Sequence, residues 1–273
     1  MRSRSRAVLP LLLLSLLAGL PAPTAAQKTA DPTLQQLHRE VQALRRGQEQ
    51  IRQQLTAIQA LLAEQEAGAE AERPVRATHV DVAGAPSRGR EDAPLVLVEF
   101  ADYQCRFCAR YARETLPLLL ERYVEPGQVR YVFMDFPLAS HPHAEMAARA
   151  AHCAGEQAAF WAMHDLLLAS VADIGSKPFV AFAAQLGIDL APFAQCLESG
   201  RHAATVQRRR AAGEAAGVTA TPFFLIGYPE PGSSRVRVDS VLRGAVPTAR
   251  FQQELDDLLL EIRPATPPPP AEQ

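Results

Sequence analysis

Apolar and polar positions follow one pattern before about residue 66 and a different one after about residue 80. In the first stretch, core positions recur at alternating spacings of three and four over about four heptads, which is typical of a coiled coil. These positions are Leu34, Leu37, Val41, Leu44, Gln48, Ile51, Leu55, Ile58 and Leu62. Asp31 and Pro32 suit a helix start and Gly68 suits a helix end, so we predict a coiled-coil helix over residues 31–66.

This helix is predicted to assemble copies of the chain through residues 34–62. Glu40 and Arg45 occupy flanking positions that can pair between parallel helices, and Gln48 in the core would fix the register. The apolar residues occupy the first and fourth positions of each heptad, called a and d. Leucines at several a positions with isoleucines at two d positions favour a trimer over a dimer. The alternative is one amphipathic helix packed on the following domain, although such helices drift towards a period of about 3.6 residues.

The second pattern predicts a mixed α/β domain after a linker over residues 69–79. The apolar run Leu95–Phe100 indicates a buried strand, and Ala109–Tyr123 has helical spacing. Alternation over Val129–Met134 indicates a second strand. The other expected elements are an edge strand within Thr78–Val82, helices from about residue 141 to residue 217, strands over Pro222–Ile226 and Val236–Leu242, and a helix over Thr248–Ile262.

The order of these elements predicts the topology of the sheet. A helix connects the first two core strands, so they should be parallel, whereas a short loop makes the last two antiparallel. A Cys-x-x-Cys motif at the start of the first helix completes the thioredoxin pattern. We therefore predict an α/β fold, a thioredoxin fold with an inserted helical domain, preceded by an N-terminal coiled-coil helix.

Both ends of the chain are predicted to lie outside the folded domain. Residues Met1–Ala26 combine a basic start with an apolar stretch and small residues before Gln27, as in a secretory signal peptide. An uncleaved membrane anchor is the alternative. Residues 264–273 are proline-rich and should form a disordered tail. Export implies a periplasmic location, in which disulfides persist.

The motif Cys105-Arg106-Phe107-Cys108 carries the candidate chemistry. It stands where the predicted strand ends and the helix begins, so unpaired N–H groups of the first helical turn should favour a thiolate at Cys105. Cys108 lies one turn further along and should be more buried. Such a pair indicates a dithiol/disulfide switch, with half of a zinc site as the alternative.

The run from Glu99 to Cys108, together with Gly217–Pro222, resembles the DsbA-like thioredoxin-fold family of bacterial envelope oxidoreductases. The resemblance covers a domain over residues 80–263, with a helical insertion over about 141–217. It implies a cis Pro222 facing the catalytic cysteines, with Thr221 pairing with extended substrate. It also implies that Glu99 is a buried acid with a raised pKa, which exchanges a proton with Cys108.

Three further expectations follow from the resemblance. Arg106 and Phe107 depart from the family, in which proline often follows the first cysteine and the best-known oxidase has histidine before the second. This pair should tune the redox potential and contact substrate. Relatives hold the second cysteine pair, Cys153 and Cys196 here, as a structural disulfide; a second redox relay is the alternative.

The function implied is a periplasmic protein thiol–disulfide oxidoreductase without a cofactor. It would form or isomerise disulfides in exported proteins, and a membrane redox partner would recycle it. The N-terminal helix resembles the stalk of trimeric ScsC-type isomerases, so oxidase and isomerase directions both stay open. The 28 Lys and Arg residues nearly balance 30 Asp and Glu residues, so no nucleic-acid partner is expected.

Two functions of other classes are the alternatives. Envelope thiols can bind Cu(I), which would make the motif a copper-handling site. A stalked adaptor would bind proteins without catalysis, although the intact motif argues against it. His141 and His143 could begin a metal site, but too few further ligands lie at suitable spacing, so no metal is expected.

Overall fold

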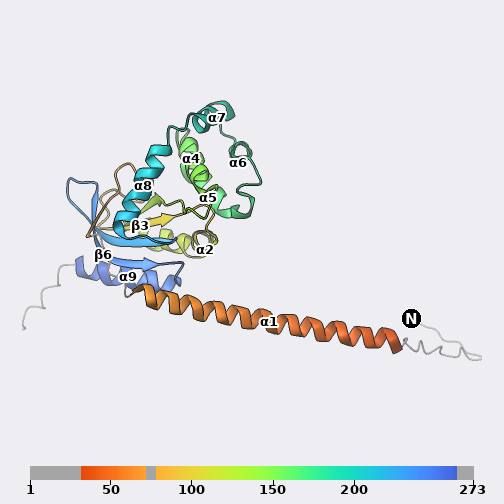
Figure 1. Ribbon diagram of the computed structural model, residues 1–273. Coiled ribbons are helices and arrows are strands. Elements are labelled where there is room, and N and C mark those ends of the chain that lie inside the picture. The colour runs from red at the N-terminus through yellow and green to blue at the C-terminus, as the bar shows by residue number, and fades with distance from the viewer. Residues whose placement is uncertain (1–31, 72–77, 263–273) are drawn as a thin grey trace, which may run out of the picture. The chain divides into compact units, whose positions relative to one another are not determined.

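The computed structural model describes residues 32–71 and 78–262, and its contacts divide the chain between Leu61 and Leu62 (Figure 1). Helix α1 (Pro32–Ala71) accounts for the predicted N-terminal helix, but it continues past Gly68, the expected end. The residues on either side of Gly68 are alanine and glutamate, which are good helix formers. A single interior glycine costs only about 1 kcal/mol relative to alanine, so it does not stop such a helix.

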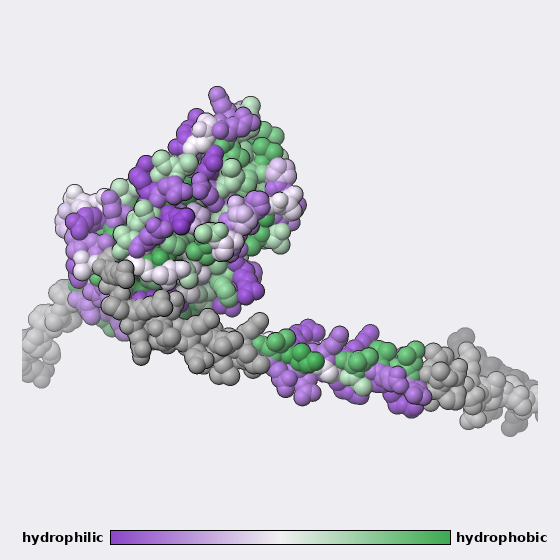
Figure 2. Space-filling view, in the orientation of Figure 1, coloured by the Kyte–Doolittle hydropathy of each residue, from purple (hydrophilic) through white to green (hydrophobic). Residues whose placement is uncertain are grey.

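The described side chains of α1 leave the apolar heptad positions uncovered. Five of them are between 40% and 70% exposed: Leu37, Val41, Leu44, Ile51 and Leu55. Figure 2 shows apolar side chains interrupting the polar surface along this part of the helix. The signal peptide predicted over residues 1–26 and the tail predicted over residues 264–273 lie outside the described residues.

Among the described residues, six strands form one sheet in the order β1-β6-β5-β3-β4-β2. They are β1 (His79–Asp81), β2 (Ser87–Arg88), β3 (Leu95–Ala101), β4 (Val129–Asp135), β5 (Phe223–Pro229) and β6 (Arg235–Arg243). The parallel pairing of β3 with β4 and the antiparallel pairing of β5 with β6 confirm the predicted topology. The short strand β2, which pairs with β4, was not predicted.

Strand β3 is buried on both faces, which explains its continuous apolar sequence. Its side chains alternate between two cores. Leu95 and Leu97 belong to one core, while Val96, Val98 and Phe100 belong to the other. The first core also contains side chains from every α-helix between Arg106 and Ile262, among them Val206, whereas Ala216 belongs to the second.

The helix after the motif is shorter and begins earlier than predicted. In place of one helix over Ala109–Tyr123, the chain forms α2 (Arg106–Glu114), α3 (Leu116–Leu119) and a wider π-helical turn over Leu120–Val124. Pro117 lies just after the break. It has no N–H to continue the hydrogen-bond ladder, which explains why α2 does not run on.

Helices α4 to α8 follow β4, and α4, α5, α6 and α7 lie beside one another (Figure 1). Their bounds are α4 (Ala144–Gly155), α5 (Phe160–Ala169), α6 (Phe179–Gln185), α7 (Leu190–Ser199) and α8 (Ala203–Ala216), with a 3-10 turn at Val171–Asp173. Asp189 caps α7 by accepting a hydrogen bond from the Ala191 N–H at 3.0 Å. Helix α9 (Thr248–Ile262) has the predicted bounds. Within the described ranges, none of the helices is both long enough and apolar enough to span a bilayer.

Candidate active site

The two motif cysteines meet at the junction of β3 and α2. Cys105 immediately precedes the first residue of α2, and Cys108 lies inside the first turn. Both are free thiols, with Cys108 fully buried and Cys105 5% exposed. The sequence therefore placed both sulfurs correctly, one at the mouth of the site and the other behind it.

Asp102 fixes the loop that carries Cys105. Its buried carboxylate accepts hydrogen bonds from the N–H groups of Gln104 (2.6 Å) and Leu138 (2.8 Å), and its Oδ2 lies 2.8 Å from His141 Nδ1. The Cys105 N–H also donates to the Asp102 carbonyl at 3.0 Å. Asp102 thus ties the loop after β3 to the loop after β4. Sequence reasoning missed it, although an acid directly after a buried strand is a usable signal.

His141 and His143, for which the sequence predicts no metal site, both make hydrogen bonds in the loops around the motif. His141 is engaged with Asp102, and the backbone N–H of His143 donates to the Gln104 side chain at 2.6 Å. Both residues therefore hold the loops around the motif. In the described part of the chain, the histidine that does lie beside two cysteines is His202, in the helical insertion.

The two thiols have opposite acidities. The pKa of Cys105 is lowered to about 6, chiefly because the Cys108 thiol donates a hydrogen bond to it, assisted by the backbone N–H groups of Phe107 and Cys108. Burial raises the pKa of Cys108 well above its usual range, and the hydrogen bond and negative charge at Cys105 raise it further. At neutral pH, Cys105 is therefore mostly a thiolate while Cys108 keeps its proton.

Glu99 lies on β3 and is 1% exposed. Its Oε2 accepts a hydrogen bond from the Tyr131 hydroxyl, whereas its Oε1 has no partner among the described residues. Burial raises the pKa of Glu99 to about 8, against the Tyr131 bond, and the negative charge of Cys105 adds to the rise. The charge of Glu99 in turn raises the pKa of Cys108, so the acid acts on the buried thiol.

Tyr131 is a site residue that the sequence did not indicate. It lies on β4 directly opposite Leu97 of the parallel strand β3, two residues before Glu99. Since side chains alternate along a strand, this register puts Tyr131 and Glu99 on the same face. Sequence patterns do not give the register, and hence do not give this contact.

Pro222 and Thr221 approach the motif from the other neighbour of β3. The Thr221–Pro222 peptide bond is cis, and Cys105 Sγ lies 3.3 Å from the Thr221 carbonyl oxygen. The following strand β5 pairs with β3 through Phe100 and Phe223. This pairing brings together two segments that are 116 residues apart in the chain.

These features can now be set beside known proteins. Residues 81–231, more than half of the 273, match the family described as Thioredoxin. The chain belongs to the thioredoxin family. Its fold is the DsbA-like form of the thioredoxin fold, as the resemblance implied.

Three solved structures show that fold. Alpha-DsbA1 of Wolbachia pipientis is 21% identical, with a TM-score of 0.59, and covers 67% of this chain and 94% of its own. BdbD of Bacillus subtilis is 18% identical, with a TM-score of 0.59 and coverage of 69% and 100%. DsbA2 of Pseudomonas aeruginosa is 24% identical, with a TM-score of 0.52 and coverage of 64% and 94%.

Curated relatives of this thioredoxin-family chain are much longer proteins. The protein named Na(+)/H(+) antiporter NhaA 3 of Salinispora tropica is 35% identical over 170 residues, which is 61% of this chain and 26% of the antiporter. The NhaA antiporter of Herminiimonas arsenicoxydans is 34% identical over 168 residues, again 26% of its length. The chain thus spans about a quarter of the curated relatives it matches.

The two residues between the motif cysteines of this thioredoxin-family chain face solvent. Phe107 is 42% exposed, and its ring lies 4.9 Å from the Arg106 guanidinium and 5.3 Å from that of Arg110. The guanidinium of Arg106 is therefore held over an aromatic ring. An exposed aromatic ring flanked by two cations is an apolar surface with a positive rim, next to the reactive sulfur.

The second cysteine pair of this thioredoxin-family chain is joined. The disulfide links Cys153 of α4 to Cys196 of α7, with the two Cα atoms 5.7 Å apart. Both residues are 1% exposed. The bond closes a separation of 43 residues within the helical insertion. A structural role for it remains a prediction.

Proposed function

We propose that this domain is a thiol–disulfide oxidoreductase that forms or isomerises disulfide bonds in exported proteins, with Cys105 as its nucleophile. One observation carries the proposal. An acidic thiol with a pKa of about 6 lies against a buried, protonated thiol, and an acid with a pKa of about 8 acts on both. A purely structural pair would need neither the difference in acidity nor a buried acid.

Each step follows from this arrangement. The Cys105 thiolate attacks a substrate disulfide, which gives a mixed disulfide and one substrate thiolate. In the mixed disulfide, Cys105 no longer carries the negative charge that helps to raise the pKa of Glu99. The ionised form of Glu99 can then take the proton of Cys108, whose thiolate attacks Cys105 Sγ. The second substrate thiolate leaves, so the substrate is reduced by two electrons and the Cys105–Cys108 pair is oxidised. The same steps in reverse oxidise a substrate dithiol.

Glu99 is suited to this proton transfer because its pKa of about 8 lies close to working pH. A carboxyl of ordinary pKa would stay ionised and could not return a proton to Cys108. The unpaired Oε1 is the atom available to Cys108, because Oε2 is engaged by Tyr131. Tyr131 therefore acts as a positioning residue for the relay.

Recycling of the motif requires a second protein. If the motif reduces its substrate, its cysteines become oxidised and an electron donor must reduce them again. If it oxidises its substrate, its cysteines become reduced and an electron acceptor must oxidise them again. We propose that this partner is a membrane redox protein and that the domain works in the periplasm. The exposed Phe107, with Arg106 and Arg110 at its rim, supports a role in contacting substrate or partner.

We further propose that α1 joins several copies of the chain as a parallel coiled coil, of which a trimer is the preferred form. Its exposed apolar side chains keep the heptad spacing across residues 37–55. A second copy offers the same stripe, and Glu40 of one helix can pair with Arg45 of the next. Several active sites on one assembly would favour isomerisation, because a client could be held while its bonds rearrange.

Redox titration tests the proposed activity. The mature protein is equilibrated in glutathione buffers, and thiols are counted by mass spectrometry. A reversible two-electron transition at Cys105 and Cys108 is expected, and Cys108→Ser should trap a mixed disulfide that Cys105→Ser cannot form. A pair that fails to exchange, or that releases bound copper on oxidation, would reject the proposal.

Truncation tests the role of the helix. Removing residues 27–68 should abolish isomerase activity and leave dithiol oxidation intact. A milder test replaces Leu44 in the stripe by glutamate, with Gln53→Glu on the solvated face as the charge-matched control. Only Leu44→Glu should lower the mass measured by light scattering. Equal masses, or unchanged isomerisation by the truncated protein, would contradict the assembly model.

A further inference from the structure

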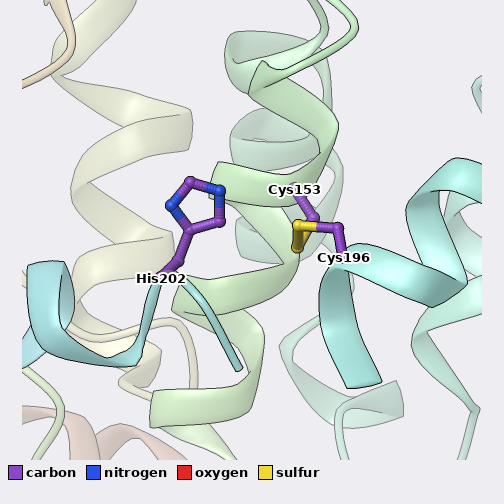
Figure 3. A group of neighbouring side chains, drawn as sticks. All are labelled: Cys153, Cys196 and His202. Carbon is purple, nitrogen blue, oxygen red and sulfur yellow. A yellow bond between two sulfur atoms is a disulfide. The ribbon is translucent and has the colours of Figure 1, made fainter. Parts of the chain in front are cut away.

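The disulfide of the helical insertion has polar neighbours that a purely structural bond does not need. His202, just before α8, lies beside Cys153 of α4 and Cys196 of α7 (Figure 3). One ring nitrogen of His202 and the two sulfurs all lie within 4.8 Å of one another. Glu156 joins them, with its Oε1 2.9 Å from His202 Nε2 and 3.6 Å from Cys196 Sγ. Two sulfurs, one imidazole and one carboxylate thus lie close together.

One separation in the cluster matches that between two ligands of a tetrahedral zinc ion, and the others must widen. With Zn–S and Zn–O bonds of about 2.3 and 2.1 Å, a sulfur and an oxygen of one tetrahedron lie about 3.6 Å apart. That is the separation of Cys196 Sγ from Glu156 Oε1. The nitrogen–oxygen pair at 2.9 Å needs to open by about half an ångström, and the reduced sulfurs must move to about 3.8 Å.

The surroundings of the cluster also suit a metal. Arg201 contacts both oxygens of Glu156. Its Nε lies 2.9 Å from Oε1, a contact that must open for Oε1 to bind a metal, and its Nη2 donates to Oε2 at 3.0 Å. Such a bond orients a ligating carboxylate. Both cysteines are buried, whereas the His202 side chain is 23% exposed and the Glu156 side chain 38% exposed. The site is therefore closed on the sulfur side and open to solvent on the side of the other two ligands.

We infer that the reduced form of this pair is a zinc site, with Cys153, Cys196 and His202 as ligands and Glu156 as the fourth. Disulfide formation and zinc binding compete for the same two sulfurs, so the chain holds either the bond or the metal. A newly exported chain, whose thiols have not yet been oxidised, is the form that binds. This site does not depend on the function proposed for Cys105.

The two forms interconvert with a defined balance. Binding of Zn²⁺ to the two thiols forms two Zn–S bonds and releases two protons. An oxidant such as glutathione disulfide reverses this. Its S–S bond breaks, the Cys153–Cys196 bond forms, two glutathione thiols leave with two protons taken up, and Zn²⁺ is released. The ion keeps its charge throughout, and the electrons pass from the cysteine sulfurs to glutathione.

The test uses the full mature chain with Cys105→Ser and Cys108→Ser, which removes the other thiols. The protein is reduced with a phosphine and refolded, and two thiols are confirmed by mass. Zinc titration should show one site per chain and the release of two protons. Cobalt in its place should give the visible bands of a tetrahedral, thiolate-bound ion. The oxidised protein should bind neither metal at this site.

A matched pair of variants separates a built site from two thiols that bind zinc without help. His202→Gln should weaken zinc binding by at least about tenfold, whereas His143→Gln, outside the cluster, should not. Circular dichroism is recorded throughout. If the reduced chain folds only when zinc is added, and less readily with His202→Gln, the inference also stands. A reduced chain that binds no zinc, folded or unfolded, or equal binding by both variants, would overturn it.

Discussion

The stability of a Glu99→Gln variant relative to the wild type should increase as pH rises. The folded pKa of Glu99 is raised from 4.5 to about 8, chiefly by burial. Below about pH 4.5 the carboxyl is protonated in both the folded and unfolded states, so it imposes no penalty. Above that pH the unfolded chain loses the proton while the folded chain keeps it. Stability is therefore lost as pH rises, until the folded carboxyl ionises near pH 8.

The magnitude follows from the same two values. One pKa unit is worth about 1.36 kcal/mol, so between about pH 5 and pH 8 the penalty grows by roughly 3–4 kcal/mol. Glutamine has no such titration. Its buried amide adds a cost of about 1–3 kcal/mol if unpaired, but this cost does not vary with pH. The difference in unfolding free energy between variant and wild type should thus shift in the variant's favour by that amount across the range.

Denaturant unfolding at a series of pH values measures this difference, with the motif reduced and the Cys153–Cys196 disulfide intact. Glu91→Gln, which removes an exposed carboxyl, is the matched control and should follow the wild type. The reasoning would be falsified if the Glu99→Gln difference were flat or fell with pH. The same variant should slow the attack of Cys108 on a mixed disulfide by about a hundredfold or more, in a rapid-quench assay.

Three further predictions follow from the described contacts. Alkylation of Cys105 should rise with a midpoint near pH 6, and a midpoint near 9 would show that its hydrogen bonds do not stabilise the thiolate. Asp135→Asn breaks a buried ion pair with Arg209 at 2.8 Å and should cost about 3–5 kcal/mol in chemical denaturation; a loss below about 1 kcal/mol would contradict a buried charge left unpaired. Replacing Cys153 and Cys196 by serine opens a loop of 43 residues and should cost about 4 kcal/mol, measured in the absence of zinc, whereas an unchanged midpoint would exclude a structural role.

The central strand β3 could be predicted because burial on both faces leaves a continuous apolar run in the sequence. Leu95–Ala101 is apolar throughout because it packs into two cores, and the predicted strand differs from it by one residue. The cysteine motif could be predicted for a similar reason, since its spacing is a property of one helical turn. Both features depend on neighbours in the chain.

The contacts that the sequence did not reveal are between residues that lie far apart in the chain. Tyr131 reaches Glu99 only through the register of β4 on β3, and Asp102 finds Leu138 and His141 only after two loops meet. Likewise, Cys153, Cys196 and His202 have no recognisable metal spacing, because three different segments bring them together. Their individual residue types carry no signal until the fold places them.

The alternation of β3 has a consequence for how this protein can vary. Because successive side chains enter different cores, an insertion or deletion of one residue between Leu95 and Glu99 would turn the carboxyl away from Tyr131 and towards the core that contains Val98. Such a chain would bury a carboxyl among apolar residues and would also lose the proton relay that we propose for Glu99. The length of this strand is therefore constrained twice, by folding and by chemistry, and we expect natural length variation to be confined to the loops and the helical insertion.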